Sequence, residues 1–204
     1  MPQNISDRPI QVNCDAGDYS LLKDLEKRKL YLSGGFDAIE DREKNYNQCL
    51  SGPSYIIKQI LDFNEQDKGL DPEERIPIRL FINSPGGSTC EGSPLVSAIE
   101  LSKTPIYTIN TGTWGFMALR IGIAGHKRFA LPCTLFKIAP MIISSEDSFD
   151  TRYGEENIEK HILEHSNMTA AEYHALSETK YMLPEDALRY GFIDEIITDI
   201  DTIL

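Results

Sequence analysis

Arg79-Leu80-Phe81-Ile82-Asn83-Ser84-Pro85-Gly86-Gly87-Ser88 joins an apolar strand to a Pro-Gly-Gly turn, and a helical pattern follows from Cys90. A strand that ends in such a turn leaves backbone N–H groups pointing into open space. Free donors of this kind suit a developing negative charge, as in an oxyanion hole. The stretch therefore predicts half of a catalytic site, and the other half requires a group that attacks a substrate.

Strands and helices alternate on both sides of this stretch. The patterns predict strands at Lys29–Gly34, Ile78–Asn83, Pro105–Asn110, Arg128–Leu131, Thr134–Ile138 and Phe192–Ile197. They predict helices at Ser54–Glu65, Cys90–Ser102, Thr113–Gly125, Glu155–Ser166, Thr169–Leu176 and Pro184–Tyr190. Such alternation indicates an α/β fold with a parallel sheet. We expect a single domain from residue 21 to 204, preceded by a flexible polar arm at residues 1–20.

The composition excludes several classes of function. The net charge of −12 argues against a nucleic-acid or anionic-membrane partner. Four widely separated cysteines without a CxxC pair predict free thiols rather than a zinc site or a disulfide framework. The chain has no apolar run near the ~20 residues of a membrane span, and Met1-Pro2-Gln3-Asn4 lacks the features of a signal region. We therefore expect a cytoplasmic protein without cofactor or metal.

Four segments carry a resemblance to a known family: Leu30–Gly34, Leu80–Ser88, Lys127–Pro132 and Glu185–Asp194. Together they resemble the proteolytic subunit of the Clp protease (ClpP-like) family. The resemblance implies a crotonase-like ββα superhelix. It also implies rings of seven subunits around a sealed chamber, an AAA+ unfoldase as partner, and serine-peptidase activity from a Ser-His-Asp triad.

The residues at the triad positions do not fit that activity. The family serine falls 29 residues after Gly87, at Phe116, and the family histidine falls 11 residues after Arg128, at Ala139. Phe116 has no nucleophilic atom, and Ala139 cannot accept a proton. For the third member, both Asp147 and Asp150 are candidates.

The backbone half of the site is better preserved. Gly87 and Met117 match the family's oxyanion donors, with Gly86 beside them, and a backbone N–H survives every side-chain change except to proline. The same glycines also suit a turn that serves geometry alone. Trp114 and Phe116 could fill the substrate groove or simply pack in the core. For Arg120 we expect an acidic partner in a neighbouring subunit or in Ser144–Asp150.

Other residues could in principle supply chemistry. His161 and His165 have an i, i+4 spacing that suits a metal, but the sequence fixes no third ligand beside them, which favours a solvated helix face and no metal site. Ser144 or Ser145 would need a base within hydrogen-bond reach, and none is predictable. Glu91 could be a base for enolate chemistry, although its place near a helix start suits the helix dipole.

The sequence therefore predicts an inactive Clp-protease-like subunit. It would form a heptamer-like ring, alone or beside an active paralogue. The resemblance makes Glu155–Ser166 the handle helix that interlocks two rings. Two alternatives stay open at this point: an inhibitory protein that caps or replaces a Clp ring, and a serine peptidase with relocated catalytic residues.

Overall fold

A computed structural model describes residues 23–36, 52–138, 151–177 and 181–204, and the side chains of 151–155 are not described. The predicted arm at residues 1–20 therefore lies outside the described residues, as do Ala139 and Ser144–Asp150.

One twisted sheet organises the described chain. Its strands are β1 (Lys29–Ser33), β2 (Ile78–Ser84), β3 (Ile106–Gly115), β4 (Lys127–Ala130), β5 (Leu135–Lys137), β6 (Tyr181–Met182) and β7 (Glu195–Ile196). The order is β1-β2-β3-β4-β7, while β5 pairs with β3 and with β6. The pairings are parallel apart from that of β5 with β6. The predicted α/β fold with a parallel sheet is confirmed.

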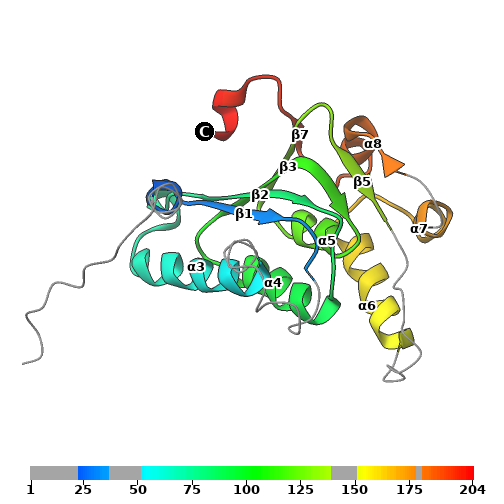
Figure 1. Ribbon diagram of the computed structural model, residues 1–204, viewed down its shortest axis with the longest axis horizontal. Coiled ribbons are helices and arrows are strands. Elements are labelled where there is room, and N and C mark those ends of the chain that lie inside the picture. Colours follow the sequence, from blue (N-terminus) through cyan, green and yellow to red (C-terminus); the bar gives the residue numbers. More distant parts are fainter. Residues whose placement is uncertain (1–22, 37–51, 139–150, 178–180) are drawn as a thin grey trace, which may run out of the picture.

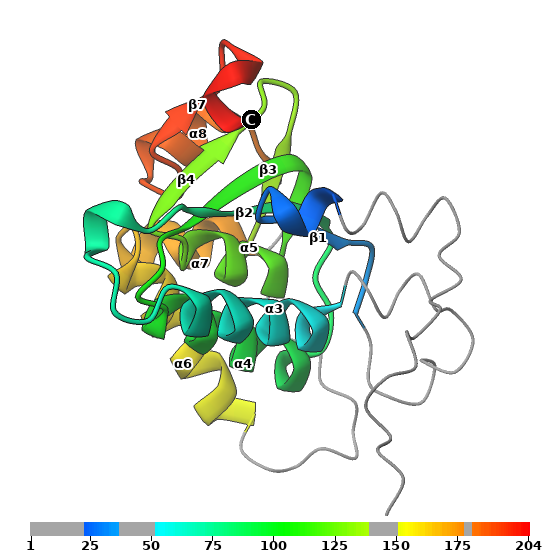
Figure 2. The same ribbon diagram turned by 90° about the vertical axis from the view of Figure 1, so that its left-hand side faces the viewer.

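The helices lie mainly on one face of this sheet. They are α3 (Pro53–Gln66), α4 (Thr89–Leu101), α5 (Met117–Ile123), α6 (Thr151–Glu164), α7 (Ala170–Ser177) and α8 (Pro184–Arg189), with short 3-10 turns at Pro72–Glu74 and Ile200–Ile203. Figures 1 and 2 show α3 and α4 side by side under β1 to β3, with α5 between them and the sheet. The C-terminal turn lies on the opposite face (Figure 1).

Alternation along β2 explains the two hydrophobic cores. Leu80 and Ile82 are fully buried in the main core, which the sheet forms with the helices. Phe81 points to the other face and joins a smaller cluster with Ile109, Phe129, Ile197 and Ile203. Because successive side chains of a strand face opposite ways, a strand covered on both faces is apolar throughout.

The helix predicted at Thr113–Gly125 is shorter than expected. It begins at Met117, and Thr113–Gly115 instead extend β3, where they pair with β5. Tyr107–Asn110 pair with β4, so β3 changes partner along its length. A continuous apolar run fits a buried strand as well as a buried helix, and the backbone bonds to β5 decide for the strand.

The last predicted strand, Phe192–Ile197, is also shorter than expected. Only Glu195 and Ile196 pair with β4, whereas Phe192 and Ile193 turn into the main core. α7 is preceded by a capping box formed by Thr169 and Glu172. The Thr169 N–H donates to Glu172 Oε2 over 2.8 Å, and the Glu172 N–H donates to Thr169 Oγ1 over 3.3 Å.

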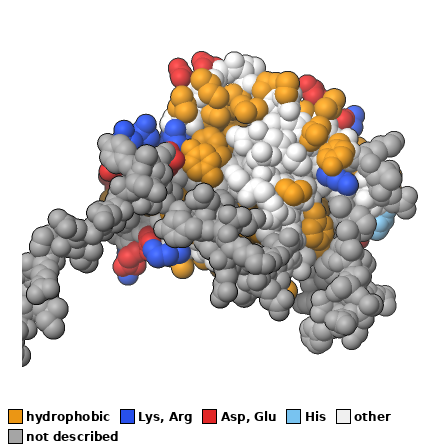
Figure 3. Space-filling view, in the orientation of Figure 1, with side chains coloured by type: hydrophobic (Ala, Val, Ile, Leu, Met, Phe, Trp, Pro, Cys, Tyr) orange, Lys and Arg blue, Asp and Glu red, His pale blue; other side chains and the backbone are white. Residues whose placement is uncertain are grey.

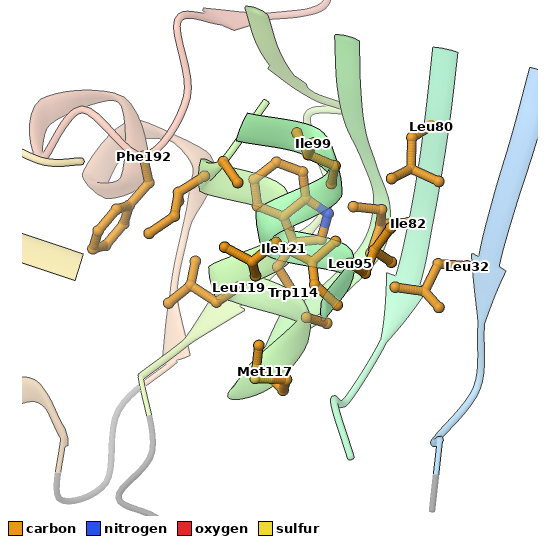
Figure 4. Close-up of a cluster of buried hydrophobic side chains, with 14 of the residues drawn as sticks. Leu32, Leu80, Ile82, Leu95, Ile99, Trp114, Met117, Leu119, Ile121 and Phe192 are labelled. Carbon is orange, nitrogen blue, oxygen red and sulfur yellow. The ribbon is translucent and has the colours of Figure 1, made fainter. Parts of the chain in front are cut away.

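Trp114 is a core residue and does not fill a groove. Its side chain is fully buried among Leu95, Ile99, Leu119 and Ile121 (Figure 4). It meets Phe136 edge to face, with ring centroids 5.3 Å apart. Gly122 of α5 lies against the indole face, where an added Cβ would collide with the ring. The contact between α5 and β3 therefore depends on a residue without a side chain.

We expect Gly122→Ala to lower the free energy of unfolding by about 1–2 kcal/mol. Overpacking a tight core costs about 1–3 kcal/mol, and the better helix propensity of alanine returns part of this, at most about 1 kcal/mol. Urea unfolding at fixed protein concentration would measure the change. Gly35→Ala is the control, because its Cβ would meet only Gly86 O, at 3.7 Å. An unchanged midpoint for Gly122→Ala would contradict the tight contact.

Candidate functional site

Phe116 occupies a strained turn between β3 and α5. Its backbone has φ 45° and ψ −112°. Within the described ranges, Arg28 is the other non-glycine residue with positive φ. Such a conformation costs on the order of 1–3 kcal/mol and persists where the surroundings enforce it. Here the Phe116 N–H donates to Lys137 O over 3.0 Å, and Phe116 O accepts from the Leu119 N–H over 3.1 Å.

A sharp, strained turn from strand to helix has the geometry of a nucleophile elbow. In an elbow, the turn residue presents its side chain at the end of the sheet while the helix behind it begins. Phe116 is the residue at that point, and its ring is half-buried against the main core. The backbone therefore has the shape of an attacking position, and the side chain has no atom that can attack.

Gly86 keeps the space in front of α5 open. Its φ is +99°, a conformation that favours glycine. A Cβ at this position would lie 2.9 Å from Met117 N and 2.6 Å from Gly115 O. Met117 is the first residue of α5, so its N–H has no acceptor within the helix. The structure thus brings Gly86, Phe116 and Met117 together. Because residue 86 has no side chain, it does not cover the Met117 N–H.

Gly87 is held by a short parallel bridge to Phe36. The Phe36 N–H donates to Gly86 O over 3.3 Å, and the Ser88 N–H donates to Phe36 O over 2.7 Å. Because N–H groups alternate along extended chain, the Gly87 N–H faces away from Phe36. That side is the one on which β3 lies. A Cβ at Gly87 would collide with Phe36, so this turn requires glycine at both positions.

Ser84, the serine just before the turn, is committed to structure. It is fully buried, its hydroxyl donates to Gly34 O over 2.6 Å, and it accepts from the Gly86 N–H over 3.0 Å. Its role is to hold β1, β2 and the glycine turn together. The other proposed site residues, Ala139, Asp147 and Asp150, and the alternative nucleophiles Ser144 and Ser145, lie outside the described residues.

A hollow of about 760 Å³ opens beside Met117, between the start of α4 and α6. Arg120, one turn along α5, lines it although only 9% exposed. Its Nη1 lies 3.7 Å from Met117 Sδ, and its Nε has no hydrogen-bond partner among the described residues. Burial lowers the pKa of Arg120, while Glu100 and Tyr173 favour the charged form. The hollow therefore holds one buried cation, and Lys160 and Glu164 of α6 also line it.

Glu91, considered for enolate chemistry, lies in the first turn of α4. Its Oε2 accepts from the Ser54 hydroxyl at 3.4 Å. This position fits the helix dipole.

His161 of α6 and His165, which follows the helix directly, have a neighbour that the sequence did not indicate. Glu100, near the end of α4, lies 2.9 Å from His161 Nε2 and 3.4 Å from His165 Nε2. Glu100 and His161 are 61 positions apart in the sequence, so no local spacing could have revealed the contact.

His126 has a different role. Its Nδ1 accepts from the Ile106 N–H over 3.1 Å and stabilises the start of β3.

Within the described ranges, every helix is too short or too polar to span a bilayer.

Known proteins similar to this chain place it in a family. The family model described as Clp protease matches residues 54–200. The ATP-dependent Clp protease proteolytic subunit of Streptococcus gordonii is 31% identical over 160 residues, which cover 71% of this chain and 77% of that protein. The subunit of Streptococcus suis is 32% identical over 158 residues, covering 70% and 76%.

Solved structures agree on the fold. The ClpP protease catalytic domain from Plasmodium falciparum has a TM-score of 0.70 and 25% identity, covering 94% of this chain and 97% of that one. ClpP1 from Listeria monocytogenes has a TM-score of 0.71 and 22% identity, covering 91% and 99%. The match of sequence and of fold over most of the length shows that this chain belongs to the Clp protease family.

Proposed function

We propose that this chain is a catalytically inactive subunit of a Clp-type ATP-dependent proteolytic complex, with a structural or regulatory role in the ring. The observation that carries the proposal is Phe116 at the strained turn between β3 and α5. Serine chemistry in this family requires a hydroxyl at the position that Phe116 occupies here, and a base that removes the proton of this hydroxyl. The matching base position is Ala139.

The geometry around Phe116 supports loss of the chemistry rather than its relocation. The turn is still held by Lys137 O, and the Gly86 and Gly87 turn still faces α5. Backbone donors that stabilise an oxyanion accelerate a reaction only when a nucleophile creates that oxyanion. Ser84 carries a buried hydroxyl next to the glycine turn, and this hydroxyl already donates to Gly34 O.

A role in assembly is supported by the surface of the domain. Figure 3 shows hydrophobic side chains gathered on the upper part of the visible face. Tyr31 is 40% exposed and stacks on Phe81 with centroids 5.2 Å apart. Ile76 and Leu204, 60% and 57% exposed, line one hollow whose other lining residues are charged. Apolar surface of this kind suits a protein partner. We propose as partners copies of this chain or paralogous subunits in a heptamer-like ring, and an AAA+ unfoldase, in the cytoplasm.

Arg120 gives this role an electrostatic basis that can be measured. A buried guanidinium with an unpartnered Nε has lost hydration without full compensation. An apolar residue in its place would not carry this cost. The charge of Arg120 stabilises the protein only where an anionic group, from another subunit or from a ligand, enters the hollow.

Reactivity toward a fluorophosphonate probe tests the inactive state. We expect no labelled serine in the wild-type protein. Phe116→Ser alone should also stay unlabelled, because no base activates the new hydroxyl. Phe116→Ser combined with Ala139→His should gain slow labelling at residue 116, detected by mass spectrometry of the peptides. Labelling of the wild type at any serine, such as Ser144 or Ser145, would establish a relocated peptidase instead.

Native mass measurement of the purified protein tests the ring. We expect a mass close to seven chains, or a mixed ring when a paralogous active subunit is added. A monomer that stays monomeric with the paralogue present, at micromolar concentration, would contradict the assembly role. Loss of the paralogue's own ring on addition of this chain would favour the inhibitory alternative.

Removing the charge of Arg120 should stabilise the fold. For Arg120→Met we expect a rise of about 1–3 kcal/mol in the free energy of unfolding, since an apolar side chain of similar length replaces a buried, incompletely bonded cation. Chemical denaturation of the unassembled chain would measure it, with Arg189→Met as an exposed control. A fall in stability of the unassembled variant would contradict an uncompensated charge, and a fall confined to the assembled protein would reveal an anionic partner in the assembly.

A further inference from the structure

The last turns of α4 and α6 meet through three side chains that can bind a metal. Glu100 precedes the final residue of α4, His161 lies in the last turn of α6, and His165 follows the helix directly. The two imidazoles stack with centroids 4.2 Å apart and planes 27° apart. One ligand atom from each of the three residues lies within 4.8 Å of the others.

The hydrogen bond of His165 determines which of its nitrogens is free. His165 Nδ1 lies 2.9 Å from His161 O, and a carbonyl oxygen only accepts, so Nδ1 carries the proton. In the neutral ring Nε2 is then an acceptor, and it faces Glu100 Oε1 at 3.4 Å. A cation between these two acceptors, either a proton on Nε2 or a metal ion, would stabilise the arrangement. A ligating histidine typically donates its other N–H to a carbonyl in this way.

His161 is prepared for a metal in a different way. Its side chain is 11% exposed, and its Nε2 lies 2.9 Å from Glu100 Oε1. Burial, reinforced by His165 and Arg120, lowers the pKa of His161 to about 3, while Glu164 acts in the opposite sense. Without a metal, the Glu100 carboxylate accepts from the Nε2–H of this ring. A metal bound at Nε2 would move that proton to the buried Nδ1, which has no hydrogen-bond partner among the described residues.

The separations fit tetrahedral coordination. With metal–ligand bonds of about 2.0–2.1 Å, two ligand atoms of a tetrahedral site are about 3.3 Å apart. The observed separations of 2.9 and 3.4 Å lie on either side of this value. Two imidazoles and one carboxylate suit Zn²⁺ and similar transition metals rather than Ca²⁺ or Mg²⁺. His165 and Glu100 are partly exposed, at 32% and 36%, so water can take the fourth position.

We propose that Glu100, His161 and His165 bind one divalent transition-metal ion, with Zn²⁺ as the natural choice, and that the ion fastens the end of α6 to the end of α4. Two charged side chains near the site have opposite effects on the binding of a cation. Arg120 disfavours an added cation, and Glu164 next to His165 favours it. The site borders the hollow that Arg120 lines, because His161 belongs to both, and it needs no residue of the strained turn. Its role is to fix α6 relative to the core.

Metal binding can be tested on the full-length protein without a histidine tag, after treatment with a chelator. We expect Zn²⁺ titrated in a calorimeter to bind at one equivalent per chain and to raise the melting temperature. Co²⁺ should give the visible absorption of a four-coordinate site. Glu100→Gln and His165→Gln should each weaken Zn²⁺ binding at least tenfold, since each removes a ligand and changes to outer-shell partners alone cost 10–100-fold.

His174→Gln is the matched control. His174 also pairs with one carboxylate, Glu159 Oε1 at 3.3 Å, but this pair is not part of the three-residue cluster. Binding should be unchanged in this variant. The melting temperatures of the metal-free variants show whether each one is folded. The proposal is overturned if Zn²⁺ does not bind, or if it binds equally well to Glu100→Gln and His165→Gln. In either case a proton, not a metal, joins His165 to Glu100.

Discussion

Backbone packs directly against backbone where the turn after β2 passes the junction of β3 and α5. A Cβ at Gly86 would press on Gly115 O, and a Cβ at Gly115 would lie 2.6 Å from Pro85 O. This approach forces the pairing of β2 with β3 to shift register between Ile82 and Ser84. It also sets where α5 begins and which N–H groups face the open end of the sheet.

That constraint explains why the shape of a catalytic site and its chemistry can separate. The turn at Phe116 is maintained by hydrogen bonds of its own backbone to Lys137 and to α5, and none of them involves a side chain of residue 116. A phenyl ring can therefore occupy this elbow-like turn, which we propose to match the family's serine position, at no cost to the main-chain geometry. In a chain of this kind the fold is evidence of the family, and the side chains at two or three positions are the evidence of activity.

Much of the fold could be predicted where one local pattern dominates. β2, α3 and α4 were placed within about two residues, in keeping with the usual uncertainty at element ends. The start of α5 was wrong because Trp114 and its neighbours are apolar in either structure, and only β5, distant in sequence, makes them a strand. Phe192 and Ile193 were placed in a strand because apolar residues suit both a sheet and a core. Glu100 could not be joined to His161 and His165, since that contact depends on how two helices pack. The positions of Phe116 and Met117 came from the family's spacing after Gly87, as the resemblance implies. The parallel pairing of β2 with β3 brings these two segments together.

Trp114 has a further significance as the single tryptophan of the chain. It lies two residues before Phe116, fully buried, with Phe136 at its edge and Gly122 against its face. The indole emission of the whole protein therefore arises from one point, at the junction of β3, β5 and α5. Solvent relaxation or quenching of that emission would report the opening of this junction separately from events at the surface of the domain or at α6. The protein thus carries an intrinsic optical probe two residues from the strained turn at Phe116.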